Sequence, residues 1–268
     1  MRARALPAIS ASYAGAAYAF LYLPIVVLVV YSFNRDGVGG FPPQHWTLDW
    51  YRALFADAAM WSAVSNSAIV ALSTVVLSML IGFPAAYALD RYSFPGKAAF
   101  QRLVLLPLIV PGVITGISLL LLTVSSGFHL SLVTVILGHS TALTAVAATE
   151  IFAGLAKLDR ALEEASADLG ASRLQTLLRI VLPGLRTSLL GTALLVFTLS
   201  MDEIAVTFFL IGRENTLPLE IWSRLRRGAT PEMNAIATLI FLFSVITIFL
   251  SQWLTTRGET GFKQTFSR

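Results

Sequence analysis

Long apolar runs separated by short polar segments dominate the chain. A helix needs about 20 predominantly apolar residues to cross roughly 30 Å of hydrocarbon, and six runs reach this length. Outside closed barrels only helices satisfy their own backbone in lipid, and the runs lack the strand-like alternation that a barrel requires. We therefore expect an all-α integral membrane protein with six transmembrane helices. Their expected positions are residues 13–33, 60–89, 103–124, 130–155, 185–211 and 234–254.

The composition agrees with this pattern and excludes several other classes. Hydrophobic residues make up 56% of the 268 residues and charged residues only 13%, about half the charged share of a soluble domain. Cysteine is absent, which excludes disulfides, cysteine-ligated zinc and thiol catalysis. The sequence shows neither a His/Glu metal cluster nor a nucleophile with a nearby base. We therefore expect no metal site, no catalytic residues and no enzymatic activity in this chain.

The basic residues predict the orientation in the membrane. The formal net charge is +4, and 13 of the 19 Lys and Arg residues lie near the termini or after the second and fourth spans. The positive-inside rule therefore predicts that both termini face the cytoplasm. Arg224, Arg226 and Arg227 in the last external loop are a local exception. Because the basic residues gather at span ends, the charge indicates membrane orientation and no nucleic-acid partner.

A polar segment between the fourth and fifth spans predicts two short helices on the cytoplasmic side. Apolar residues recur at spacings of four, three and four between Leu158 and Leu169, which forms one apolar stripe on a helix. Gly170 follows, where the end of a helix often needs a positive φ. Ser172 with Gln175 three residues later is typical of a capping box that opens a second helix.

The charge of the first of these helices favours a protein partner over the membrane surface. Residues 157–168 contain four carboxylates and two basic side chains, so the anionic inner leaflet would repel them. The alternative is an amphipathic pair that lies on the lipid headgroups. The second helix has its own apolar face, from Leu174 to Val181. It ends at Pro183, which suits the start of the next span because its missing N–H costs little there.

One string in this segment resembles the EAA loop of ABC importer permeases. Ser166 stands where the family usually has a second alanine, a small-for-small change that preserves the spacing. Residues 87–96 (YALDRYSFPG) and 107–116 (PLIVPGVITG) are similar to the same family. The residues that carry the loop resemblance are Glu164, Ala165, Ser166, Gly170, Ile180, Leu182 and Pro183.

The resemblance implies a type I ABC importer permease fold, with residues 1–268 as a single transmembrane domain. Residues 60–256 would form a family core of five helices, and the first span would be an added peripheral helix. Residues 156–183 would be the cytoplasmic coupling loop, whose first helix fits a cleft on an ATPase subunit. Glu164 would contact the ATPase, and Gly170 would let the hinge bend.

The resemblance also implies the partners and the location. The chain has no GxxxxGK[ST] motif, so it would bind no cofactor, and ATP and magnesium would bind to separate ATPase subunits. The expected partners are a second, non-identical permease subunit, two copies of an ABC ATPase, a periplasmic or lipid-anchored solute-binding protein, and the lipid bilayer. The expected location is the bacterial inner membrane, with several passes.

Three carboxylates lie within apolar runs, where burial of each costs roughly 3 kcal/mol. Asp202 and Glu203 would stand ~100° apart on a continuous fifth helix. Either could attract a cationic substrate in the pathway, or could bond instead to a hydroxyl, a backbone group or a partner. Glu150, nearer the cytoplasmic end of the fourth span, favours a structural role. His139 in the same span indicates a hydrogen-bonded packing histidine more than a proton relay.

The segment 200–240 narrows the resemblance to the permeases of polyamine uptake, in which an acidic pair precedes stretches such as TLPLEIW and TPEMNAIATL. That branch also serves opines and phosphonate-like solutes. Carboxylates suit amines better than anions, and the span interiors hold no Arg or Lys, so we expect ATP-driven import of spermidine or putrescine. A proton-coupled secondary carrier is the alternative from another class. The inverted repeats common in such carriers are not found in the sequence.

Overall fold

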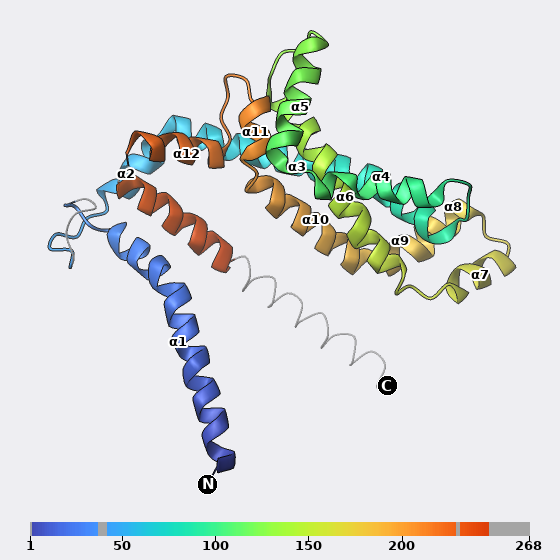
Figure 1. Ribbon diagram of the computed structural model, residues 1–268, viewed down its shortest axis with the longest axis horizontal. Coiled ribbons are helices and arrows are strands. Elements are labelled where there is room, and N and C mark those ends of the chain that lie inside the picture. The colour runs from blue at the N-terminus through green and yellow to red at the C-terminus, as the bar shows by residue number, and fades with distance from the viewer. Residues whose placement is uncertain (1, 37–41, 229–230, 247–268) are drawn as a thin grey trace. The chain divides into compact units, whose positions relative to one another are not determined.

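The computed structural model describes residues 2–36, 42–228 and 231–246, which are almost entirely helical (Figure 1). In these ranges the only β pairing is an isolated bridge between Asn34 and Trp46, so the all-α expectation is confirmed. A further helix, Pro231–Ile246, follows α12. The elements are α1 (Arg2–Tyr31), α2 (Asp49–Ala56), α3 (Ala58–Arg91), α4 (Lys97–Ile109), α5 (Gly112–Ser125), α6 (Leu132–Leu155), α7 (Ala161–Asp168), α8 (Arg173–Thr176), the π-helix η2 (Leu177–Val181), α9 (Leu182–Gly184), α10 (Arg186–Met201), α11 (Ala205–Leu210) and α12 (Leu217–Arg227).

Three helices are long and apolar enough to cross a bilayer, namely Ser12–Tyr31 of α1, α3 and α6. Two bent pairs pass the same test when each is taken together: α4 with α5 at 104°, and Arg173–Gly184 with α10 at 69°. The described residues thus hold up to five spans of sufficient length. The expected last span begins in the shorter helix Pro231–Ile246, but residues 247–254 lie outside the described residues. The total of six stays a prediction.

Two of the expected spans are not continuous helices. The third divides at Pro111, which has extended ψ and directly precedes α5 as its N-cap, whereas Pro107 lies within α4 without ending it. The expected fifth span, 185–211, also divides, because α10 ends at Met201 and α11 begins at Ala205. A single fifth helix is therefore wrong. Apolar residues continue on both sides of the break, so the apolar pattern gives no sign of where the helix ends.

The chain divides into two compact units, residues 1–58 with 223–268 and residues 59–222. Polar contacts hold the first unit together. The Tyr51 hydroxyl lies 2.6 Å from Ser32 Oγ, and the Trp50 indole N–H donates to the Asn34 carbonyl at 2.8 Å. Arg224 forms an ion pair with Asp57 at 2.5 Å. Residues from both ends of the sequence thus build this unit.

In the second unit α6 packs against α4, α5, α10 and α11. Small residues allow close approach at these contacts. Gly138 of α6 lies against Val206 of α11, and Gly116 of α5 lies against the Ala205 carbonyl of α11. Gly82 brings α3 to the backbone of α6. Because lipid is as apolar as the helices, such packing and interhelical hydrogen bonds hold the helices together.

We expect Gly82→Ala to lower the thermal stability of the purified chain in detergent. An added Cβ would lie 2.9 Å from the Ala147 Cβ and 3.0 Å from the Ala148 backbone nitrogen, so α3 and α6 would have to separate. Gly191→Ala in α10 is the matched control, because its added Cβ would meet no described atom within 4 Å. Size-exclusion chromatography after heating compares the two. Equal midpoints would contradict this account of the packing.

Candidate functional site

The segment between α6 and α10 forms two helical pieces joined at Gly170. The first piece, α7, ends at Asp168, and Gly170 has a φ of +80°, which glycine adopts without steric cost. Ser172 Oγ accepts the Gln175 N–H at 3.3 Å, and Gln175 Oε1 accepts the Ser172 N–H at 2.8 Å. The predicted capping box is therefore confirmed. Figure 1 shows α7 at one end of the second unit, beyond α9.

The second piece runs without interruption through α8, η2 and α9 and then bends before α10. Ile180 lies in the π-helix, and Leu182 and Pro183 lie in α9. Pro183 has no N–H to donate to the preceding turn, which makes wider π geometry favourable there. Pro183 does not begin the next span as expected, because α10 begins at Arg186 beyond the bend.

From Leu162 to Leu169 the predicted apolar stripe faces outward, whereas its first residue, Leu158, is half-buried and packs against the cluster of Ile151 and Val181. Leu162 is 51% exposed and Leu169 89% exposed. Ala165 and Glu164 are exposed too, and the Glu164 side chain has no hydrogen bond or ion pair within the described residues. A contiguous exposed apolar stripe of this kind marks an interaction surface.

The face of α7 next to this stripe contacts the second helical piece. Ser166 is buried, and its Oγ lies 3.0 Å from Thr176 Oγ1 of α8. This contact explains why a small polar residue fits position 166, where a larger side chain would separate the two helices.

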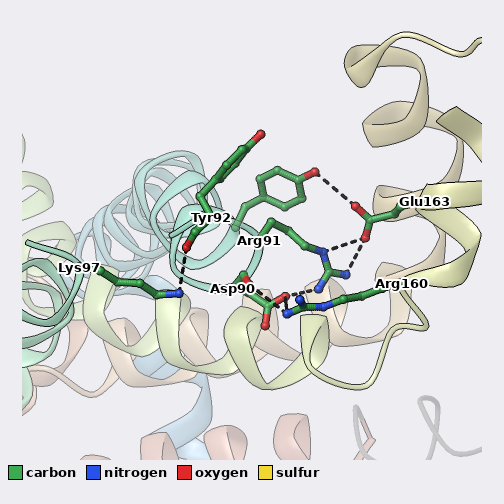
Figure 2. Close-up of polar contacts among 7 residues, drawn as sticks. Asp90, Arg91, Tyr92, Lys97, Arg160 and Glu163 are labelled. Carbon is green, nitrogen blue, oxygen red and sulfur yellow. Dashed lines mark hydrogen bonds and ion pairs between the residues drawn. The ribbon is translucent and has the colours of Figure 1, made fainter. Parts of the chain in front are cut away.

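Figure 2 shows a polar network that joins α7 to the end of α3. Arg91 Nε lies 2.9 Å and Nη2 2.6 Å from Glu163 Oε1, while Nη1 contacts Asp90. The Tyr87 hydroxyl donates to Glu163 Oε2 at 3.5 Å, and Arg160 donates to the Asp90 carbonyl at 3.0 Å. Sequence analysis missed this network, because Arg91 and Glu163 stand 72 positions apart. Only the charges on either side of the loop hinted at it.

The break between α10 and α11 gives the two neighbouring carboxylates different environments. Glu203 Oε1 accepts the Val206 N–H at 2.9 Å, which satisfies a free donor at the start of α11. Asp202 is exposed and has no hydrogen bond or ion pair within the described residues. Of the alternatives open from the sequence, Glu203 thus makes the backbone bond and Asp202 keeps a free carboxylate.

His139 of α6 holds both sides of this break. It is buried, with Nδ1 2.8 Å from Ser200 Oγ in α10 and Nε2 2.8 Å from Thr207 Oγ1 in α11. The predicted hydrogen-bonded packing role of His139 is confirmed. Glu150, farther along α6, is exposed, and no contact within the described residues supports its expected structural role.

The far end of α3 makes a second set of polar contacts. Asn66 Nδ2 donates to the Asn215 carbonyl at 2.9 Å, and Ser67 Oγ accepts the Leu217 N–H at 2.8 Å. These bonds fix the segment before α12 to α3. The described residues contain no group of His, Cys, Asp and Glu that could hold a metal ion.

The described residues form apolar helices that could span a membrane, and two of the expected spans are broken. An exposed helical pair lies between α6 and α10. These features agree with a permease subunit. The chain belongs to the family described as binding-protein-dependent transport system inner membrane component, whose model matches residues 78–260. It is 38% identical over 250 residues to the putrescine transport system permease protein PotI of Escherichia coli strain K12, covering 90% of this chain and 89% of PotI. It is 34% identical over 243 residues to the spermidine/putrescine transport system permease protein PotC of Haemophilus influenzae, covering 90% and 94%.

Solved structures support the fold. A chain of a bacterial ABC transporter involved in the import of alginate aligns with a TM-score of 0.72 at 16% identity, covering 95% of this chain and 96% of that one. A chain of the MetNI methionine ABC transporter in an inward-facing conformation aligns at 0.56 with 20% identity, covering 75% and 96%. The expected ABC permease fold is confirmed, and the chain is an inner-membrane permease subunit of an ABC importer.

We expect His139→Leu to lower the thermal stability of the chain in detergent, because the hydroxyls of Ser200 and Thr207 would lose their shared partner. Interhelical hydrogen bonds in membranes average about 0.6 kcal/mol each, so the loss should be about 1 kcal/mol. Thr141→Val is the matched control, since Thr141 is exposed and bonds only within α6. Equal unfolding midpoints for the two variants would show that His139 does not hold the break.

Proposed function

We propose that this permease imports polyamines such as putrescine or spermidine, and that Asp202 is the carboxylate that meets the cationic substrate. The observation that carries the proposal is the free, exposed carboxylate of Asp202 at a helix break within an apolar body. The chain's relatives PotI and PotC, named as putrescine and spermidine/putrescine permeases, support the same substrate class.

The break itself favours a cation. The last carbonyls of α10 have no helical donors beyond Met201, and the carboxyl end of a helix carries partial negative charge. Asp202 adds a full negative charge at the same point. In membrane transporters, half-helix ends of this kind line substrate sites. Because Glu203 caps α11, we assign it to holding the break and not to direct contact with the substrate.

We further propose the composition of the complete importer. It would contain this chain, a second non-identical permease subunit, two copies of an ABC ATPase that bind ATP and magnesium, and a periplasmic or lipid-anchored solute-binding protein. The family description supports the binding-protein requirement. The excess of basic residues near the termini and after the second and fourth spans supports cytoplasmic termini.

The 156–183 loop is the proposed docking site for the ATPase. Glu164 and the exposed stripe of Leu162, Ala165 and Leu169 would enter a cleft of the ATPase, with Gly170 as the hinge. The stripe supplies the apolar contact area and Glu164 supplies a charge free to pair with a partner. The alternative mechanism, a proton-coupled carrier, would need neither the loop nor an ATPase.

We expect Asp202→Asn to raise the KM for radiolabelled putrescine and spermidine in proteoliposomes that contain the complete importer. The rise should be about tenfold, because a charge-assisted contact with an ammonium group is lost. Glu150→Gln is the matched control, because it removes an exposed, unpaired carboxylate from another span.

The outcomes separate the substrate class from the transporter class. Equal kinetics for Asp202→Asn and wild type would remove Asp202 from the pathway. ATP-dependent uptake of an opine or phosphonate-like solute, with neither amine transported, would overturn the polyamine assignment. Amine uptake that persists without the ATPase would show a secondary carrier.

We expect Glu164→Lys to release the ATPase from the permease pair. The reversed charge would meet the ATPase side chain that wild-type Glu164 attracts, and like charges in a contact cost affinity. Co-purification with a tagged ATPase measures the loss. Asp168→Asn, which removes an exposed carboxylate one turn after Glu164 on the same helix face, should co-purify normally, because the charge at position 164 is retained. Full recovery of the ATPase with Glu164→Lys would exclude docking through this residue.

A further inference from the structure

The two adjacent glutamates of α7 have opposite environments. Neighbouring positions on a helix point about 100° apart. Glu164 is exposed and unpaired within the described residues. Glu163 turns toward α3, and its side chain, 16% exposed, forms the ion pair with Arg91. One face of α7 is therefore free for a partner while the other is attached to the membrane body.

Polar contacts hold α7 in place. Ser166 is its only buried residue, so apolar packing contributes little, and a pocket of about 330 Å³ lies beside it, bordered by Tyr92 and Ala171 among others. The position of α7 depends on the Ser166–Thr176 contact with α8 and on the pairing of Glu163 with Arg91. Helices joined by such contacts can shift relative to each other without opening an apolar core.

The ion pair between Arg91 and Glu163 is shielded from water and should be strong. The Arg91 side chain is only 8% exposed, and charges removed from water interact strongly with each other. Asp90 contacts the same guanidinium and also accepts from Arg160, which comes just before α7. Separating Glu163 from Arg91 would leave a nearly buried guanidinium short of a partner, which is costly. The ion pair should therefore persist when α7 moves.

A displacement of Arg91 would be passed along α3, which has contacts near both of its ends. Near Arg91, Ala86 packs with Ile151 of α6 and Val181 of η2. About 25 residues earlier, roughly 37 Å along the axis at 1.5 Å per residue, Asn66 and Ser67 hold the segment before α12. A single uninterrupted helix thus connects the docking loop with the far end of this unit.

We propose that the Arg91–Glu163 ion pair is a transmission link that makes α3 move with α7 when the docked ATPase moves the loop. The inference rests on the proposed docking function of the 156–183 loop. Glu163 and Arg91 are positioning residues in this scheme, because neither touches the substrate or ATP. The covalent route through α8 to α10 is the first connection between loop and spans, and this ion pair is the second.

The test measures substrate transported per ATP hydrolysed by the complete importer in proteoliposomes. We expect Glu163→Gln and Arg91→Gln each to lower this ratio about fivefold, within the range for residues on a coupling route. The double variant should be no worse than the worse single one, because both remove the same link. Asp168→Asn, with the same loss of charge on α7, should keep the wild-type ratio.

A covalent cross-link in place of the ion pair tests whether the connection itself transmits movement or only stabilises the fold. The chain has no cysteine, so Arg91→Cys with Glu163→Cys gives a unique thiol pair in this subunit. A short bis-maleimide that joins the two should restore the ratio, and the uncross-linked pair should not. Failure of the cross-link to restore coupling, additive effects of the two Gln changes, or an unchanged ratio in both would each overturn the proposal.

Co-purification of the ATPase distinguishes this inference from the docking proposal beneath it. Glu163→Gln should retain the ATPase that Glu164→Lys releases. Loss of the ATPase from Glu163→Gln would overturn the link, because Glu163 would then serve docking. Retention of the ATPase by Glu164→Lys would refute the docking proposal, whatever the transport ratio of the Glu163 variant.

Discussion

Close approach of helices to α6 is the constraint on which the second unit depends. In lipid, apolar burial does not draw helices together, so small residues and hydrogen bonds must do so. Gly138 and Gly82 bring α11 and α3 to α6, and His139 of α6 bonds to both α10 and α11. Without these contacts the break between α10 and α11 would have nothing to hold its two ends in register.

Polar groups in this apolar body connect helices to one another. Several buried polar side chains form hydrogen bonds between elements, as His139 does across the break and Ser166 does between α7 and α8. Glu203 likewise satisfies the start of α11. Asp202 and Glu150 are both exposed and unpaired within the described residues, but of the two only Asp202 lies at a helix break. An ionised group in an apolar body is costly unless something else meets it. The proposal that Asp202 meets the substrate therefore depends on its position at the break as well as on its free carboxylate.

The sequence predicted local features well and distant contacts poorly. Capping at Ser172 and the positive φ of Gly170 depend on residues within three positions, so both were visible in the pattern. The pairing of Arg91 with Glu163 depends on the packing of α3 beside the loop, which no local signal encodes. The break after Met201 was concealed by apolar residues on both sides, although an acidic pair in such a run was itself a sign of interrupted helix.

In the proposed function, the 156–183 loop would have to satisfy two opposite demands. It would have to move when the ATPase moves, and it would have to carry that movement to the spans. Attachment through polar contacts satisfies both demands. Ion pairs and hydrogen bonds have discrete geometries and can be displaced as a unit. A packed apolar interface resists sliding. In this proposal the exposed apolar stripe of α7 contacts the partner, and the ion pair of Glu163 connects α7 to α3. Apolar contact suits the partner side, and charge suits the side that leads to α3.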